Sequence, residues 1–488
     1  MRNSISEQGR LDCPSVTDLH LNVNCRDEIV PILAALQHVY SHQKLCARLM
    51  QVIEDDVNER SSSDRGRPGM GYWEILVLAA VRLGCNFDYD HLHNLAEEHR
   101  TLRRIMGIGD WEENVRFSRT QIRDNICLLS DSTIESISHA IVEAGYELVP
   151  DAVKRQRADS TVVETNIHYP TESSLIFDGV RKVIELCVRL HETHEITGWR
   201  QHGHWLKQVK RSNRSIARIV AKKGGSYKQR LKSEYAALLK RAHAVLQRAE
   251  ESCKTLECEF ELSLQAICLI ASVRQFASLT LQVCGTATRR VINDETVPNS
   301  DKLFSIFEPH TQLYRRGKAG VPNQYGRLVL FFEDAAGFIT HHYVMPRNAQ
   351  DADVAVEQTE ALQKRLDGRI ESVSFDRGFH SPKNQEDLAE IVANVCLPMP
   401  GAKQSVTQQE AATDEFREMQ KRHSGIESAI GALQSGNGLV RCRDSSEQGF
   451  NRYTAMAVLG RNLHTLGRIL IARQREDASS ATTLRQSM

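Results

Sequence analysis

The spacing of apolar residues in the first third of the chain predicts helices. Ile32, Leu33, Leu36, Val39 and Tyr40 recur at helical intervals. Residues 61–71 are typical of a loop, and 73–83 form an apolar helix. We expect Ser132 and Glu135 to form a capping box, and Gly145 to end the helix that follows. The pattern fits either a helix-turn-helix DNA-binding domain or a plain helical bundle.

Short runs rich in β-branched residues begin at about residue 157 and indicate strands. A helical stretch separates the first predicted strand from the others, and its apolar positions predict an antiparallel helical hairpin. Strands are expected at 158–166, 327–332, 338–344, 370–375 and 395–399, and helices at 351–366, 385–392, 414–433 and 453–471.

This order of elements predicts a mixed α/β fold whose core is interrupted by a helical insertion. The helices before the first strand form a separate domain in this interpretation. The expected segments are a polar, disordered N-terminus (1–27), a helical domain (28–150), the core (151–177 and 291–435), a basic helical insertion (178–290), a C-terminal helical part of the core (436–475) and a disordered tail (476–488).

The composition is that of a globular protein, with 488 residues and 62 basic against 62 acidic side chains. A formal net charge of zero excludes a uniformly basic nucleic-acid coat protein and a disordered acidic chain. No run approaches 18 apolar residues and the N-terminus has no apolar core, so we expect no membrane association and a cytoplasmic location. The twelve cysteines form no CxxC pair and are interpreted as reduced thiols.

The zero net charge conceals one strongly basic segment. Residues 196–245 hold thirteen Lys and Arg but a single acid, Glu234. A block of one sign repels itself and favours a polyanion as neighbour, with Trp199, Trp205 and Tyr227 available to pack on sugar or base. The alternative is a solvated basic helix that faces an acidic patch of the same fold. The candidate phosphate contacts are Arg200, Lys207, Lys210, Arg211, Arg214, Arg218, Lys222 and Lys223.

Three carboxylates stand where a charge is costly to bury without a partner. Asp159 lies inside the first predicted strand, Asp376 ends a later strand, and Glu427 lies beside the apolar stripe of a late helix. Two Mg²⁺ ions about 3.5–4 Å apart require carboxylates from separate elements. The three acids therefore predict a two-metal site for phosphoryl transfer.

Several motifs resemble the DDE transposases of bacterial insertion sequences, especially the heterogeneous group often called "not classified yet". The resemblance covers nearly the whole chain. It rests on the GRPG loop (66–69), ADSTVVETNIHYPTES (158–173), YRRGKAGVPNQYGRLVLF (314–331), SFDRGFHSP (374–382), RHSGIESAIG (422–431), GLVRCR (438–443) and NLHTLGRIL (462–470).

The resemblance implies a ribonuclease H-like core in which Asp159, Asp376 and Glu427 are the catalytic triad. Asp159 and Asp376 would bind Mg²⁺, with Mn²⁺ as an alternative ion, and Glu427 would complete the second metal site. The implied partners are double-stranded DNA, as element ends and target, and further copies of the chain in a dimer or larger assembly. The protein would associate with the bacterial nucleoid when bound to DNA.

Further DNA contacts are expected near the triad and before the second strand: Arg315, Arg316, Lys318, Arg377, His380 and Arg422. Two of them have a structural alternative, in which Arg377 pairs with a nearby acid and His380 caps the next helix. The chain departs from many relatives at offsets −7, −4 and +7 from Glu427, where Gln420, His423 and Gln434 replace Tyr, Arg and Lys. Arg422 is the candidate substitute for the missing Arg.

Two other functions remain open. A magnesium-dependent nuclease that cuts but does not join DNA would need the same three carboxylates. An inactivated transposase kept as a DNA-binding protein is the third interpretation, and the intact triad argues against it.

Overall fold

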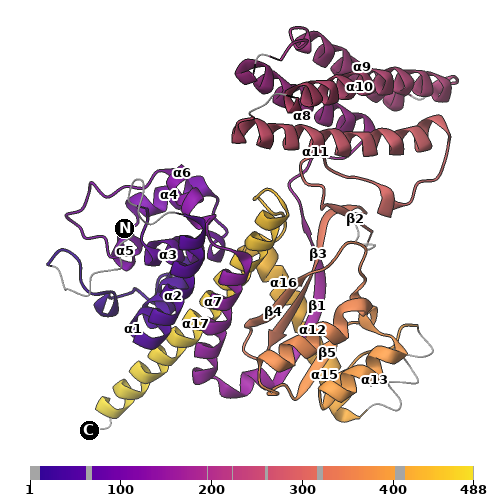
Figure 1. The fold of residues 1–488 in the computed structure, drawn as a ribbon. Coiled ribbons are helices and arrows are strands. Elements are labelled where there is room, and N and C mark those ends of the chain that lie inside the picture. The colour runs from indigo at the N-terminus through magenta and orange to yellow at the C-terminus, as the bar shows by residue number, and fades with distance from the viewer. Residues whose placement is uncertain are drawn as a thin grey trace. The chain divides into compact units, whose positions relative to one another are not determined.

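The structure is a computed structural model that describes residues 11–61, 69–194, 196–222, 224–258, 262–315, 322–401 and 413–486. The chain is mixed α/β, as expected, and divides into two compact units. The first comprises residues 1–164 and 327–488, and the second comprises 165–326. Figure 1 traces the order of the elements.

The first unit begins with seven helices, and three of them pack against a long C-terminal helix, α17 (Glu447–Gln486). Packing of α1, α3 and α7 against α17 gives this helix its buried face. The seven helices are α1 (Ile29–Ser41), α2 (Gln43–Arg60), α3 (Tyr72–Gly84), α4 (Tyr89–Glu98), α5 (Arg100–Ile105), α6 (Arg119–Ile126) and α7 (Asp131–Leu148).

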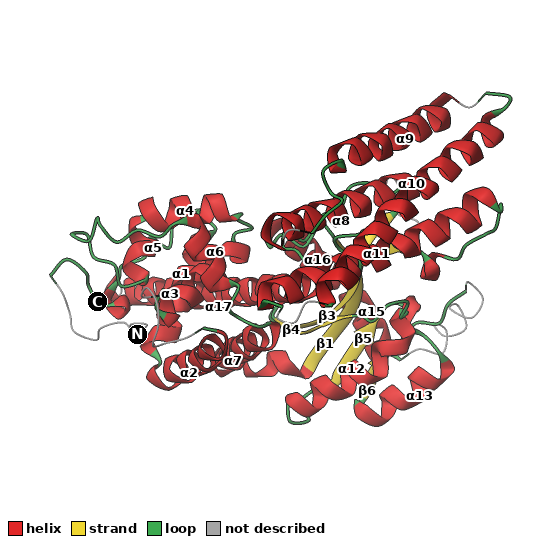
Figure 2. Cartoon of the chain, turned by 45° about the horizontal axis from the view of Figure 1, so that its top comes forward, coloured by secondary structure: helices red, strands yellow, loops and turns green. Residues whose placement is uncertain are grey.

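The second part of the first unit is a mixed sheet with flanking helices (Figure 2). Its strands lie in the order β4-β3-β1-β5-β6, with β1, β5 and β6 parallel and β3 antiparallel to β4. Helix α12 packs against β4, α15 against β5 and α16 against β1. The elements are β1 (Arg155–Glu164), β3 (Gln324–Asp334), β4 (Ile339–Val344), α12 (Asp351–Arg365), β5 (Ser372–Phe375), α13 (Pro382–Ile391), β6 (Asn394–Cys396), α15 (Asp414–His423) and α16 (Gly425–Gly436).

The second unit is a four-helix bundle followed by a short strand. Its core includes Trp199, Leu238 and Ile270, all nearly inaccessible to solvent. The strand β2 (Gln312–Tyr314) pairs with the first residues of β3. The helices are α8 (Glu172–His194), α9 (His202–Lys222), α10 (Tyr227–Glu257) and α11 (Leu264–Ala287). This unit contains the whole helical insertion predicted at 178–290. It begins before residue 178, because α8 begins at Glu172.

One helix of the bundle meets a length and composition test for a membrane span, although no such span is expected from runs of apolar residues. It covers Leu264–Ile292. One such helix is weak support for a span, because a helix of a soluble bundle passes the same test. In the bundle, α11 packs closely against α8.

The structure differs from the sequence interpretation at both chain ends. Residues 11–27 are not disordered, because Val16, Leu19 and Leu21 are buried and the Gln37 side chain donates to the carbonyls of Val16 and Leu19. At the other end α17 continues to Gln486, past the expected start of a disordered tail. No Gly or Pro follows Arg475, so nothing in this stretch breaks the helix.

The predicted limits of α7 are also wrong. Ser130, not Ser132, is the N-cap, and its hydroxyl accepts from the Thr133 backbone N–H. The helix continues past Gly145 to Leu148. Gly145 does not end the helix but leaves room for the Phe338 ring, since a Cβ at residue 145 would lie 2.4 Å from that ring.

Candidate functional site

Asp159 and Asp376 lie at neighbouring positions of two parallel strands. Ala158 of β1 pairs with Phe375, the last residue of β5, and each acid directly follows one of these two residues. Adjacent strands are about 4.8 Å apart, and residues at equivalent register point to the same face of the sheet. The two carboxylates therefore belong to one face at one edge of the core.

Each of these acids has one oxygen engaged by the backbone that follows it. Asp159 Oδ1 accepts the Ser160 N–H at 2.7 Å, and Asp376 Oδ1 accepts the Arg377 N–H at 2.7 Å. Asp159 is half-buried, whereas Asp376 is exposed and caps the short helix Arg377–Phe379.

Glu427 lies in the first turn of α16 and is exposed. The opposite side of α16 is buried through Ile426, Ala429, Ile430 and Leu433. Helix α16 packs against β1, the strand that carries Asp159. The predicted helix 414–433 is thus two helices separated at Ser424, and Glu427 belongs to the second.

His423 connects two of the three acids electrostatically. Burial lowers the pKa of His423, and the charges of Asp376 and Glu427 oppose this effect. Its Nδ1 lies 3.2 Å from the Ser374 hydroxyl on β5. Both carboxylates are therefore close enough to His423 to act on its charge.

Metal binding requires the side chains to gather around one point. Among the described residues, no group of three or more His, Cys, Asp and Glu side chains is placed to hold one ion. The carboxylates of Asp159 and Asp376, which directly follow the register pair Ala158 and Phe375, have the oxygen chemistry that Mg²⁺ prefers. Glu427 has the same chemistry but is not grouped with them.

Asp351, the first residue of α12, is a further carboxylate near this edge that sequence reasoning missed. Its carboxylate accepts from the Ser160 hydroxyl, and its Oδ2 would lie 3.3 Å from a Cβ at Gly378. Asp351 therefore contacts the residue after Asp159 and lies close to Gly378, two residues after Asp376. No sequence signal points to it, because α12 is distant in sequence from both strands.

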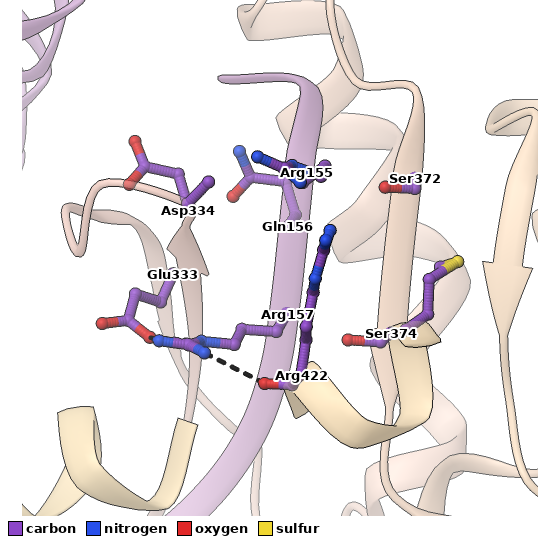
Figure 3. Close-up of a pocket in the computed structure, with 10 residues that line it drawn as sticks. Arg155, Gln156, Arg157, Glu333, Asp334, Ser372, Ser374 and Arg422 are labelled. Carbon is purple, nitrogen blue, oxygen red and sulfur yellow. Dashed lines mark hydrogen bonds and ion pairs between the residues drawn. The ribbon is translucent and has the colours of Figure 1, made fainter. Parts of the chain in front are cut away.

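A cavity of about 400 Å³ opens on the same face of the sheet, before the acids along each strand (Figure 3). Arg157 reaches from β1 to Glu333 and to the backbone carbonyl of Arg422. The cavity is lined by Arg155, Gln156, Arg157, Glu333, Asp334, Ala335, Ser372, Ser374, Met419 and Arg422.

In the second unit, the basic residues expected to bind phosphate lie on one side of α9. Lys207, Arg211, Arg214, Arg218 and Lys222 recur at steps of three or four and are exposed. The buried side of this helix is formed by Val209, Ser212 and Ile216. We call these five cations, with Lys210, the basic face.

No ion pair involves any residue of the basic face within the described part of the chain, and Arg200 and Lys210 are likewise exposed. Lys232 on α10, by contrast, pairs with Asp294 at 2.5 Å. Lys223 lies outside the described residues.

The expected stacking role of Trp199 is wrong. Its side chain is fully buried in the bundle, where the indole N–H donates to the Ser252 hydroxyl at 3.0 Å. Trp205 is partly buried, contacts the Trp199 ring edge to face and lies under the Arg248 guanidinium. These rings stabilise the bundle, because an apolar ring gains more from burial than from a solvent-exposed position.

The remaining predicted DNA contacts have mixed surroundings. Arg315 is exposed and its Nε donates to Asn323 Oδ1, while Arg316 and Lys318 lie outside the described residues. Arg377 is exposed, and Arg422 is exposed and ion-paired with Glu418.

His380 does not cap the next helix, because Ser381 does so through Asn384 N–H. The buried Nε2 of His380 has no hydrogen-bond partner among the described residues.

No family model, curated protein or solved structure matches the chain. The interpretation of the site therefore depends on the motifs in the sequence and on the geometry described above.

Proposed function

We propose that the chain is a DDE transposase that cleaves the ends of a mobile DNA element and joins them to target DNA. The observation that carries this proposal is the register of β1 and β5, with Asp159 and Asp376 each directly following the pair Ala158 and Phe375. Two carboxylates in adjacent strands, with a third on a helix packed against one of them, suit metal-dependent phosphoryl transfer.

The element order supports a ribonuclease H-like core. Among the strands of the first unit, β1 is the first and β5 the fourth in chain order. Asp159 lies on the first, Asp376 follows the fourth, and Glu427 lies on a late helix. This is the order in which the sequence motifs place the acids of the transposase triad.

Asp159 and Asp376 would hold Mg²⁺ or Mn²⁺, and Glu427 would complete the site from the first turn of α16. Bound ions supply activation of an attacking hydroxyl and stabilisation of the leaving oxygen. The carboxylates would orient and retain the ions, and the exposed Arg377, directly after Asp376, would contact a phosphate. The role of the protein is chiefly electrostatic in this type of chemistry.

The basic face supplies the second part of the proposal, which is contact with the DNA backbone. Five cations along one side of a helix, with no acidic partner among the described residues, would neutralise several phosphates. Processing of two DNA ends requires two active sites, so the functional form is a dimer or larger assembly on DNA.

Cleavage of the DNA that flanks the gene tests the proposal. The wild-type chain is expected to nick this DNA in the presence of Mg²⁺, and Asp159→Asn is expected to abolish nicking while DNA binding persists. Equal nicking by both proteins would exclude Asp159 from catalysis. Nicking without joining would favour the magnesium-dependent nuclease.

A further inference from the structure

One arginine beside the candidate triad connects three separate elements. Arg157 lies two residues before Asp159 on β1, so both side chains belong to the same face of the sheet. Its Nε and Nη2 contact Glu333 Oε2, each at 2.5 Å, and its Nη1 donates to the Arg422 carbonyl at 3.0 Å. Figure 3 shows this side chain between Glu333 and the backbone of Arg422. The guanidinium thus joins β1, β3 and the end of α15.

The contact with Arg422 is made at the C-terminal end of α15, where the same carbonyl also accepts the Ser424 backbone N–H. Helix α15 ends at His423, so the Arg422 carbonyl is among the last four of that helix. A cation there satisfies a carbonyl and interacts favourably with the helix dipole. Glu333 is only 3% exposed, so its charge is balanced in a nearly dry environment by Arg157.

The next helix begins against the same guanidinium. Gly425 is the first residue of α16, and a Cβ at this position would overlap Arg157 Nη1 and lie 2.7 Å from Cζ. Only a hydrogen atom fits there. Gly425 is therefore needed for close approach to Arg157, and Glu427 follows it within the first turn.

A second attachment holds the same turn. Ser374 is the register partner of Arg157 across β1 and β5, and its hydroxyl lies 3.2 Å from His423 Nδ1. One row of the sheet, Arg157 and Ser374, thus binds the junction of α15 and α16. The acids Asp159 and Asp376 lie two residues further along the same strands.

We propose that Arg157, seated against Gly425, is a positioning residue that fixes α16 so that Glu427 can join Asp159 and Asp376 in binding a divalent cation. This inference rests on the proposed function for the role of Glu427. Arg157 itself contacts neither the substrate nor the ion in this proposal. It acts through the position of α16.

Two changes remove the contact by different routes. Gly425→Ala displaces the guanidinium but leaves every charge in place. The double variant Arg157→Gln with Glu333→Gln removes the ion pair without leaving a buried charge unpaired, so that folding is preserved. Gly431→Ala is the matched control, since it makes the same change in α16 where no heavy atom lies within 4 Å of the added Cβ.

Hydrogen exchange of the α16 amides and Mn²⁺ affinity, measured by electron paramagnetic resonance on the full chain, provide two readouts that do not require activity. We expect faster exchange over 425–436 in Gly425→Ala and in the double variant, and Mn²⁺ affinity lowered about tenfold, as for other residues that orient ligands. Arg157→Lys should bind Mn²⁺ more tightly than the double variant but less tightly than wild type. Gly431→Ala should retain the wild-type Mn²⁺ affinity.

Unchanged exchange and Mn²⁺ affinity in Gly425→Ala and in the double variant would overturn the proposal. An equal loss of Mn²⁺ affinity in Gly431→Ala would overturn it too, because any change in α16 would then lower the affinity. A wild-type chain that binds no Mn²⁺ would also overturn the proposal. Failure of the wild-type chain to cleave DNA, with Mn²⁺ binding and the expected differences intact, would count against the proposed function alone.

Discussion

Asp159 and Asp376 directly follow the paired residues Ala158 and Phe375, on two strands that run parallel. The two acids are separated by more than two hundred residues in the chain, including the whole second unit. A sheet that brings carboxylates together from such distant segments concentrates negative charge at one edge. This arrangement is costly unless a cation compensates it.

The third acid is expected to be as necessary as the other two. Glu427→Gln should lower DNA cleavage by about 10²–10³-fold, because it removes one charge from the site that stabilises the reacting phosphate. Glu418→Gln is the matched control, since Glu418 is also an exposed acid near this region but pairs with Arg422. Initial rates of plasmid nicking measure both. Similar losses in the two variants would remove the special role of Glu427.

The basic face should set the salt dependence of DNA binding. Replacing Lys207, Arg211, Arg214 and Arg218 by Gln should make the slope of log K against log salt less steep by about 3 to 4, if each contacts one phosphate. Lys254→Gln changes an exposed lysine of α10 that lies 3.8 Å from Glu250, and it should leave the slope unaltered. Fluorescence anisotropy across a salt series gives both slopes. A wild-type slope in the quadruple variant would exclude the basic face as a DNA contact.

Close packing of α3 and α17 should make Gly460 intolerant of a side chain. A Cβ at Gly460 would lie 2.5 Å from the backbone N of Gly84, and the backbone cannot rotate away as a side chain can. Gly460→Ala should lower the free energy of unfolding of the first unit by about 1–3 kcal/mol through overpacking.

Gly431→Ala, in open space on α16, should instead raise that free energy by about 0.5–1 kcal/mol. Urea unfolding followed by circular dichroism compares the two variants. Equal stability of Gly460→Ala and wild type would show that the helices separate at little cost.

The carboxyl of Asp334 should make stability depend on pH near neutrality. Burial raises its pKa to about 7, although the Phe338 and Ala336 N–H groups favour its charged form. The folded state therefore holds this proton more tightly than the unfolded chain does, whose Asp pKa is about 3.9. The resulting stabilisation is complete below about pH 4 and is lost as the pH rises through about 7.

Asp334→Asn keeps a hydrogen-bond acceptor but cannot ionise. Its Tm relative to wild type should increase from pH 5 to pH 8, because only the wild-type protein must bury a charge at the higher pH. Calorimetry at several pH values measures this difference. A difference that is independent of pH would show that Asp334 does not titrate in this range.

The sequence predicts the order of the core elements well because each has a strong local period. Strand β5 and helix α12 agree closely with their predicted limits, whereas β1 begins three residues and ends two residues before its predicted limits. Local patterns fail where tertiary contacts decide. The predicted helix 414–433 breaks at Ser424, next to the point where Arg157 packs against Gly425, and Trp199 is buried by the bundle although its neighbours in sequence are basic.

The positions of Asp159, Asp376 and Glu427 on their elements could also be anticipated from the sequence. Their supporting residues could be found only in part. Side chains alternate between the two faces of β1, so the two-residue spacing of Arg157 and Asp159 places them on the same face. This spacing can be read from the sequence. The contacts of Asp351 with Ser160 depend on how α12 packs, which no local pattern reports.

Joining of DNA 3′-hydroxyl ends to a target plasmid is the measurement that bears most directly on transposase activity. The substrate is the DNA that brackets the gene, and Asp159→Asn protein and metal-free buffer are the controls. We predict Mg²⁺-dependent joined products with the wild-type chain and none with either control. Joined products that persist with Asp159→Asn, or cleaved ends that are never joined, would contradict the assignment as a DDE transposase.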